Sequence, residues 1–210
     1  MAATTVLSAV PAVAAPGATA LATTVVRDGY GRFTFNARLS HQGVKYHSPD
    51  QEDWAPTTWG LSCKKTTHSF ASLKSLRASR VIGSAGIESD DKEMILEFTS
   101  TAAATRFMND LATTWRSCDN DYESRNVRVR YDDGRVYGPW TQGLALRNWW
   151  QTRPSGRWQN VPGGSMQLVV RKGNRVTMAG IGGELVGDSW NNVGVRKTLL
   201  SRVTWSAKRM

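Results

Sequence analysis

The sequence is poor in the residues that usually build metal centres and nucleophilic active sites. Only two cysteines and three histidines occur among its 210 residues, with no Cys-x-x-Cys pair and no neighbouring pair of histidines. The Gly-x-Ser-x-Gly, His-Glu-x-x-His and phosphate-loop motifs are also absent. We therefore predict that the protein is not an enzyme and that it holds neither a metal ion nor a cofactor.

Long hydrophobic runs are missing as well. After the N-terminal region, no apolar stretch reaches the roughly 18 residues that a membrane-spanning helix needs, so we predict no transmembrane segment in the mature chain. Hydrophobic residues still make up 40% of the sequence. At this length that is enough for one domain with a packed core.

The N-terminal 22 residues contain no charge and are almost all small or apolar. They end in Ala20-Leu21-Ala22, which fits the pattern of a signal peptidase site. We predict that residues 1–22 are a signal peptide, or else a disordered leader on a cytosolic protein. Residues 23–60 are predicted as a poorly defined segment and residues 61–210 as the folded domain. The first alternative predicts a secreted, extracytoplasmic protein.

The two cysteines, Cys63 and Cys118, allow a single intramolecular pairing. A disulfide between them would agree with export, because such bonds persist mainly in oxidising compartments. The alternative is a pair of buried free thiols, as in many cytosolic proteins.

Charge is distributed unevenly along the chain. Residues 1–124 hold 12 Lys and Arg against 13 Asp and Glu, whereas residues 125–210 hold 15 against 4 and also six of the nine tryptophans. The second half therefore carries a net charge of +11, and the first half carries −1. This asymmetry predicts a basic face that meets an anionic partner.

The clearest local pattern in the chain lies between Met94 and Cys118. Alternating apolar residues from Met94 to Phe98 predict a strand with one buried face. Ser100 or Thr101 then offers a helix N-cap. The apolar residues that follow recur at helical spacing and predict a helix of about four turns: Phe107, Leu111, Trp115 and Cys118.

The flanking segments predict further strands and helices. Residues 32–37 are predicted as an edge strand, and the stretch from Ser69 as a short helix followed by a strand. Residues 127–131 alternate apolar residues with Arg, which predicts a strand with a basic outer face. Asp132-Asp133-Gly134 predicts a tight hairpin turn after it.

The C-terminal third is predicted as strand, hairpin and helix. Residues 144–150 are predicted as a strand, and residues 166–179 as a β-hairpin turning at Gly173-Asn174. The repeat from Val195 to Val203 predicts a C-terminal helix. These elements together predict an α+β fold with an antiparallel sheet and two or three packed helices.

Two parts of the sequence resemble a known family, the extracellular sensor domains of the PknH-type receptor kinases of actinobacteria and their stand-alone exported relatives. The first part joins a strand, Leu96-Glu97-Phe98, to an Ala-rich helix start at Ala102-Ala103-Ala104, an aromatic at Phe107 and Trp115-Arg116-Ser117-Cys118. The second is the hairpin from Leu168 to Val176.

This resemblance implies an antiparallel α+β domain with a central cleft for an unknown ligand. Cys63 and Cys118 match the first of the family's two disulfides by position, and the second pair is absent. The chain also has no kinase segment, so the resemblance implies signalling through a partner.

The candidate binding residues of the basic half are aromatic and basic. Trp and Arg together stack on sugar rings or lipid head groups and pair with phosphates or carboxylates. Consecutive Trp149 and Trp150 would point to opposite faces of a strand. The alternative is that most of these tryptophans belong to the core. The candidates are Trp140, Arg147, Trp149, Trp150, Arg153, Arg157 and Trp158.

The sequence is therefore interpreted as a secreted, non-catalytic ligand-binding domain of the sensor type. Its ligand would be an anionic or amphiphilic component of the cell envelope, a lipid head group or a cell-wall polymer, with contact to a membrane surface included. Nucleic acid is not expected as a partner of an exported protein. A cytosolic nucleic-acid binder is nevertheless a separate alternative, and it predicts free thiols.

A hydrolase is the alternative from the enzyme class. His41 and His47 lie in a polar region close to Asp50 and Glu52, and such groups could perform acid–base chemistry in a small secreted hydrolase. Solvated loop residues are the preferred interpretation of these four side chains.

Overall fold

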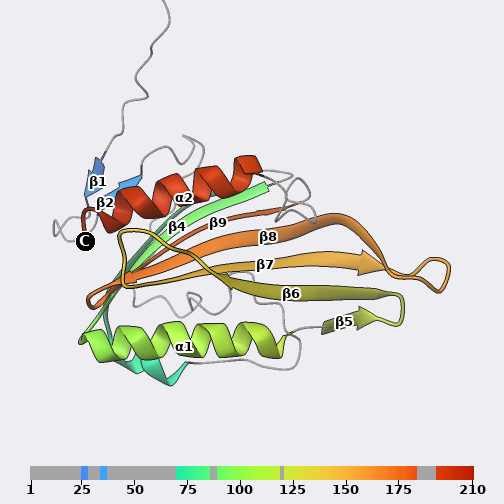
Figure 1. Cartoon of the computed structure of the whole chain (residues 1–210), viewed down its shortest axis with the longest axis horizontal. Helices are drawn as coiled ribbons and strands as arrows, with labels where there is room; N and C mark the ends of the chain where they lie inside the picture. The colour runs from blue at the N-terminus through green and yellow to red at the C-terminus, as the bar shows by residue number, and fades with distance from the viewer. Residues whose placement is uncertain (1–24, 28–33, 37–69, 86–88, 119–120, 184–192) are drawn as a thin grey trace, which may run out of the picture.

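The computed structural model describes residues 25–27, 34–36, 70–85, 89–118, 121–183 and 193–210. Its main element is a seven-stranded antiparallel sheet in the order β3-β4-β9-β8-β7-β6-β5 (Figure 1). A two-stranded sheet, β1 (Val25–Arg27) with β2 (Thr34–Asn36), lies beside the C-terminal helix. The α+β class predicted from the sequence is confirmed.

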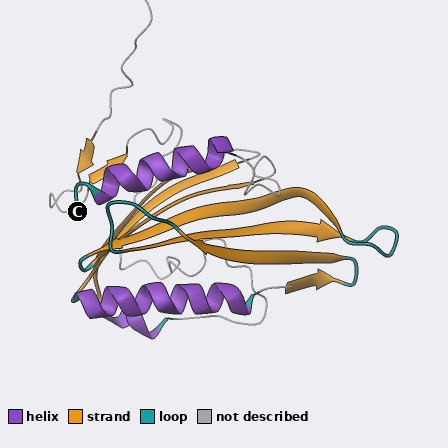
Figure 2. Cartoon of the chain, viewed as in Figure 1, coloured by secondary structure: helices purple, strands orange, loops and turns teal. Residues whose placement is uncertain are grey.

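One helix packs on each face of the large sheet (Figure 2). Helix α1 (Thr101–Ser117) lies over the face that we call the α1 face, and α2 (Val193–Ala207) lies over the opposite α2 face. A short 3-10 helix, η1 (Ala71–Ser75), precedes β3 and lies against α1.

The sheet is built from two hairpin-connected parts. The first is β3 (Leu76–Ala85) with β4 (Ser89–Phe98). The second is a meander of five strands: β5 (Asp121–Ser124), β6 (Val127–Arg135), β7 (Gln142–Thr152), β8 (Gln159–Lys172) and β9 (Arg175–Gly183). The two parts join where β4 pairs with β9.

The strand–helix unit predicted between Met94 and Cys118 is confirmed, but the single buried face predicted for the strand is wrong. Glu93, Ile95 and Glu97 on the other face of β4 are also at most 6% exposed, because α2 covers that face. Met94, Leu96 and Phe98 are buried on β4, and α1 begins directly afterwards with Ser100 as its N-cap, whose hydroxyl accepts the Ala103 backbone N–H. The apolar side of the helix packs on the sheet through Phe107, Leu111 and Trp115, all at most 1% exposed. Burying three side chains of this size contributes several kcal/mol, about 1.5–3 kcal/mol for each.

The predicted hairpin at Gly173-Asn174 and the C-terminal helix are also confirmed. Lys172 pairs with Arg175 across the turn, and Gly173 has a φ of 59°, which glycine adopts without strain. On α2, Leu199 and Val203 are buried against the α2 face, whereas Leu200 is 37% exposed. The predicted edge strand at 32–37 corresponds to β2, which belongs to the smaller sheet.

The tight turn predicted at Asp132-Asp133-Gly134 is wrong. Strand β6 continues through these residues in unbroken register with β7, and the chain reverses only over residues 136–141. The acidic residues tolerate the strand because each has a basic partner. Arg147 of β7 binds Asp132, and Arg116 of α1 binds Asp133. Tertiary ion pairs here override the local turn preference.

Trp115 links α1 to the sheet. Its ring is fully buried, stacks edge-on against Tyr131 and donates from Nε1 to two carbonyl oxygens, Asp132 at 2.9 Å and Arg147 at 3.1 Å. The indole therefore bonds to β6 and β7 at the same point.

Replacing Trp115 by Phe should lower the free energy of unfolding by about 1–3 kcal/mol, because two buried carbonyl groups lose their donor. Urea denaturation measures the change. Trp205→Phe is the matched control, since its half-buried indole makes no nitrogen hydrogen bond within the described part of the chain. We expect the control to cost about 1 kcal/mol or less. Equal losses in the two variants would contradict a linking role for the Trp115 indole.

Candidate functional site

The alternation of β6 and β7 places basic and aromatic side chains together on the α2 face. On β6, Val129 and Tyr131 are buried toward α1, so Arg128 and Arg130 point to the other face. Trp149 is the register partner of Arg130, and Arg147 precedes it by two residues on the same face. Helix α2 packs mainly on β8 and β9, so it leaves this part of the sheet uncovered.

These side chains form two cation–π groups, one around Trp149 and one around Trp158, that we together call the Arg–Trp ladder: Arg128, Arg130, Arg147, Trp149, Arg153 and Trp158. The Arg147 Cζ lies 4.4 Å from the centre of the Trp149 ring, and the Arg128 Cζ lies 4.2 Å from that of Trp158. Arg130 and Arg153 each lie 5.8 Å from a ring. All four distances fall within the range of cation–π attraction.

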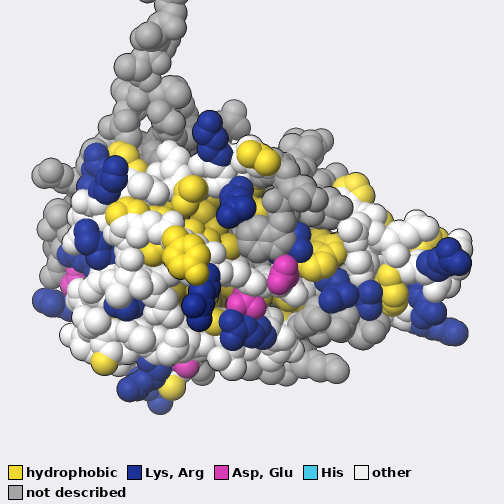
Figure 3. All heavy atoms as spheres, viewed as in Figure 1, with side chains coloured by type: hydrophobic (Ala, Val, Ile, Leu, Met, Phe, Trp, Pro, Cys, Tyr) yellow, Lys and Arg dark blue, Asp and Glu magenta, His cyan; other side chains and the backbone are white. Residues whose placement is uncertain are grey.

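Hydrogen bonds hold the ladder arginines in position. Arg147 Nη2 donates to Asp132 Oδ2 at 3.1 Å, and Arg128 Nε donates to Gln151 Oε1 at 2.8 Å. Arg153 Nε donates to the Gly156 carbonyl at 2.7 Å. Of these three acceptors, the Asp132 carboxylate is charged and the other two are neutral. Figure 3 shows basic side chains gathered at the end of the molecule where β7 connects to β8.

The seven residues predicted from the sequence separate into groups in the structure. Arg147 pairs with Trp149 and Arg153 with Trp158, so these four residues belong to the ladder. Arg157 is an exposed residue of the loop between β7 and β8. Trp150 points to the α1 face as the register partner of Val129, with 37% of its surface exposed. The expectation that Trp149 and Trp150 point to opposite faces is confirmed.

Trp140 lies apart from the ladder, at the other end of β7. Its Nε1 donates to the Val136 carbonyl at 2.9 Å, and its ring lies over Gly138 and Gly143. A Cβ on either glycine would come within 2.5 Å of Trp140 or of the Val136 carbonyl. Trp140 is partly buried and packs the loop of residues 136–141 against the core of the α2 face.

Sequence reasoning missed Arg128 and Arg130 as ladder members. The signal was present, because Arg alternates with apolar residues on β6 and again faces Trp149 on β7. What the sequence alone lacks is the register that sets the two strands side by side.

A groove lies on the opposite side of the sheet, between α1 and the end of the β6–β7 hairpin. Its volume is about 540 Å³, and we call it the α1 groove. It is lined by Asn109, Ala112, Thr113 and Arg116 of α1, Asp133, Gly134 and Arg135 of β6, and Gln142 and Leu144 of β7. A smaller hollow of about 360 Å³ under the 136–141 loop shares Arg135, Gln142 and Leu144 with it.

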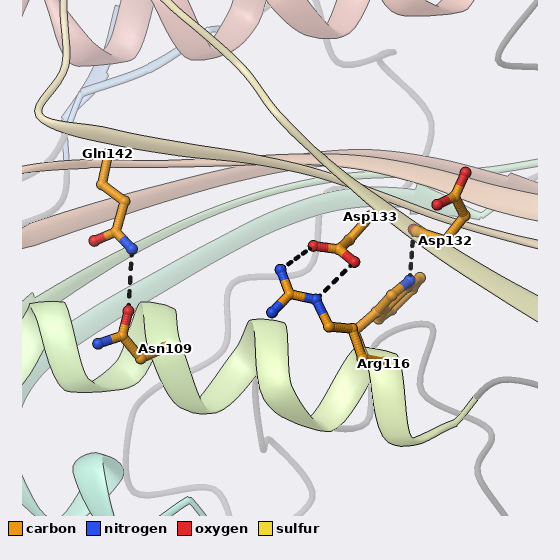
Figure 4. A network of polar contacts seen from close by, with 6 residues as sticks. Asn109, Arg116, Asp132, Asp133 and Gln142 are labelled. Atoms are coloured by element: carbon orange, nitrogen blue, oxygen red, sulfur yellow. Dashed lines mark hydrogen bonds and ion pairs between the residues drawn. The ribbon is translucent and has the colours of Figure 1, made fainter.

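Two polar bridges span the α1 groove (Figure 4). Arg116 forms a fork with Asp133, at 2.9 Å from Nε to Oδ1 and 2.6 Å from Nη2 to Oδ2. This contact raises the pKa of Arg116, mainly through the hydrogen bond and then through the opposite charge. About two helical turns away along α1, Gln142 Nε2 donates to Asn109 Oδ1 at 3.3 Å.

The other predicted groups are not placed by the described residues. His41, His47, Asp50, Glu52 and Cys63 all lie outside the described ranges. Within those ranges no group of three or more His, Cys, Asp or Glu side chains could hold a metal ion. No helix in the same part of the chain is long and apolar enough to cross a membrane.

Cys118 is the C-cap residue of α1 and is 3% exposed. Its thiol is not free. Because Cys63 lies outside the described residues, the Cys63–Cys118 pairing stays a prediction.

Comparison with known proteins gives a structural similarity and no sequence family. The chain is similar to the extracellular domain of PknH from Mycobacterium tuberculosis, with a TM-score of 0.46 and 8% identity over 82% of this chain and 81% of that chain. No family model and no curated protein matches the sequence. Membership of the PknH-type family therefore stays a prediction.

The position of Trp149 depends on a close approach of β8. Gly164 pairs with Trp149, has a φ of 148°, and a Cβ on it would lie 2.3 Å from the Asn148 carbonyl oxygen. Only glycine fits between the two strands at this point.

Gly164→Ala should therefore destabilise the protein and displace the strand that carries Trp149. The loss in unfolding free energy should exceed the roughly 1–3 kcal/mol of a strained backbone alone, as measured by urea denaturation. Gly156→Ala is the control, because Gly156 also has a positive φ, 78°, yet has no atom within 4 Å of an added Cβ. A smaller loss for Gly164→Ala than for Gly156→Ala would disprove the close-approach argument.

Proposed function

We propose that the protein is a non-catalytic, extracytoplasmic binding domain of the sensor type. Its ligand is an anionic or amphiphilic component of the cell envelope, bound at the Arg–Trp ladder. The observation that carries the proposal is the ladder itself, in which four guanidinium groups stack with two indole rings on a part of the sheet that α2 leaves uncovered.

The chemistry of the ladder suits such a ligand. Guanidinium groups bind phosphate and carboxylate oxygens through paired hydrogen bonds. Indole rings contribute flat apolar surface for a sugar ring or for the glycerol region of a lipid. Because stacking and hydrogen bonds fix the arginines beforehand, binding loses less side-chain entropy.

The positive balance of the second half of the chain supports the same proposal. The strands β6 to β9 and the helix α2 come from the half with 15 basic and 4 acidic residues. A surface of this charge draws anions toward it and raises their association rate, and salt weakens that attraction.

A double variant, Arg128→Gln with Arg147→Gln, should weaken binding to vesicles that contain phosphatidylglycerol, or to a polyol-phosphate polymer, by about tenfold or more, because each basic residue contributes about 1 kcal/mol at an anionic surface. Co-sedimentation at increasing salt measures the effect. The matched control removes the same charge from exposed positions on α2, as Arg196→Gln with Lys197→Gln. The proposal fails if the wild-type protein binds neither probe, or if both double variants lose affinity equally.

The proposal includes export and a Cys63–Cys118 disulfide. Cys118 ends the helix that Trp115 joins to the sheet, so a bond there would tie a distant segment to the core. A closed loop of about 55 residues would stabilise the fold by up to about 4 kcal/mol through the entropy of the unfolded chain.

Protein recovered from culture fluid and denatured without reductant should therefore show no free thiol. After reduction it should show two. Cys118→Ser should lower the unfolding free energy of oxidised protein much more than that of reduced protein. Two reactive thiols in the unreduced sample would instead support the cytosolic alternative.

A further inference from the structure

We propose that the α1 groove is a second binding site, for a small organic anion that carries one carboxylate or phosphate group on a short apolar body. This site lies on the face of the sheet opposite the Arg–Trp ladder and does not depend on the ladder's function.

The charges around the groove favour an anion. Arg116 and Asp133 neutralise each other in their fork. Arg135 follows Asp133 by two residues on the same face of β6, lines both the groove and the adjoining hollow, and makes no ion pair or hydrogen bond within the described residues. Its guanidinium therefore leaves the groove with one positive charge.

A second cation lies behind the groove wall. Arg171 of β8 is 6% exposed, and its acceptors are both neutral, Gln142 Oε1 at 3.4 Å and the Gly173 carbonyl at 2.9 Å. Burial lowers the pKa of this guanidinium. A buried cation that pairs with no carboxylate among the described residues is costly, and an anion nearby would reduce the cost.

The groove also offers neutral donors and an apolar floor. The Thr113 hydroxyl and the side-chain amides of Asn109 and Gln142 line it, next to Ala112 and Leu144. One oxyanion can meet Arg135 and a neutral donor together, while a few methylene groups rest on the floor.

The two polar bridges give the groove a fixed width. They join α1 to β6 at Arg116 and to β7 at Asn109, on either side of Thr113 (Figure 4). A site held open in this way needs little rearrangement to accept a ligand.

The test is a titration of the full chain with butyrate, inorganic phosphate and the neutral analogue butyramide, followed by amide NMR shifts. We expect saturable shifts at Thr113, Arg135 and Gln142 with butyrate, with phosphate or with both, and none with butyramide. Saturable shifts with butyrate but not phosphate would identify a carboxylate site. Saturable shifts with phosphate but not butyrate would identify a phosphate site.

The variants separate this site from the ladder. Arg135→Gln should weaken anion binding by about tenfold, and Thr113→Val should weaken it less while keeping the side-chain shape. Anion affinity at the α1 groove should stay unchanged in the Arg196→Gln variant, which lies on the other face. It should also stay unchanged in the double variant Arg128→Gln with Arg147→Gln. Arg135 is exposed, so circular dichroism should show a folded variant. Absence of saturable shifts with both anions, or full affinity in a folded Arg135→Gln variant, would overturn the proposal.

Discussion

The arrangement of both faces of the sheet depends on one buried indole. Trp115 bonds to the carbonyl groups of Asp132 and Arg147, which face each other on β6 and β7. The side chains of these two residues point to the α2 face, where Arg147 stacks on Trp149. The next residue along β6, Asp133, points back toward α1 and meets Arg116. A single side chain of α1 thus fixes the backbone from which the ladder and the α1 groove both extend.

Most of the fold could be predicted from local patterns, and the exceptions have a common cause. The β4–α1 unit and the β8–β9 hairpin follow from apolar spacing, an N-cap and a glycine turn, all of which act within a few residues. The segment Asp132-Asp133-Gly134 has equally strong turn residues, yet it continues as a strand. Its partners, Arg116 and Arg147, lie about 15 residues away in either direction, and no local pattern contains them.

The candidate site shows the same limit. The sequence singled out Arg147, Trp149, Arg153 and Trp158, and the structure pairs Arg147 with Trp149 and Arg153 with Trp158. Trp140 and Trp150 share their residue type with the ladder, but register and strand alternation place them elsewhere. The residues of the α1 groove were not predicted, and Arg116 was named only within the Trp115–Cys118 motif. Arg116 becomes informative only once the packing of α1 on β6 is known, because that packing brings it to Asp133.

The junction between β4 and β9 has a consequence for how the chain folds. Leu96 pairs with Val176, so two neighbouring strands of the sheet come from segments 80 residues apart in the sequence. The β3–β4 hairpin can form early, but its inner edge stays open until β9 has been synthesised. Closing so long a loop is entropically costly and slows the search for the native pairing. In a chain of this topology, cooperative folding of the whole sheet comes late. It requires β9 to pair with β4 of the first hairpin and α2 to pack on β8 and β9.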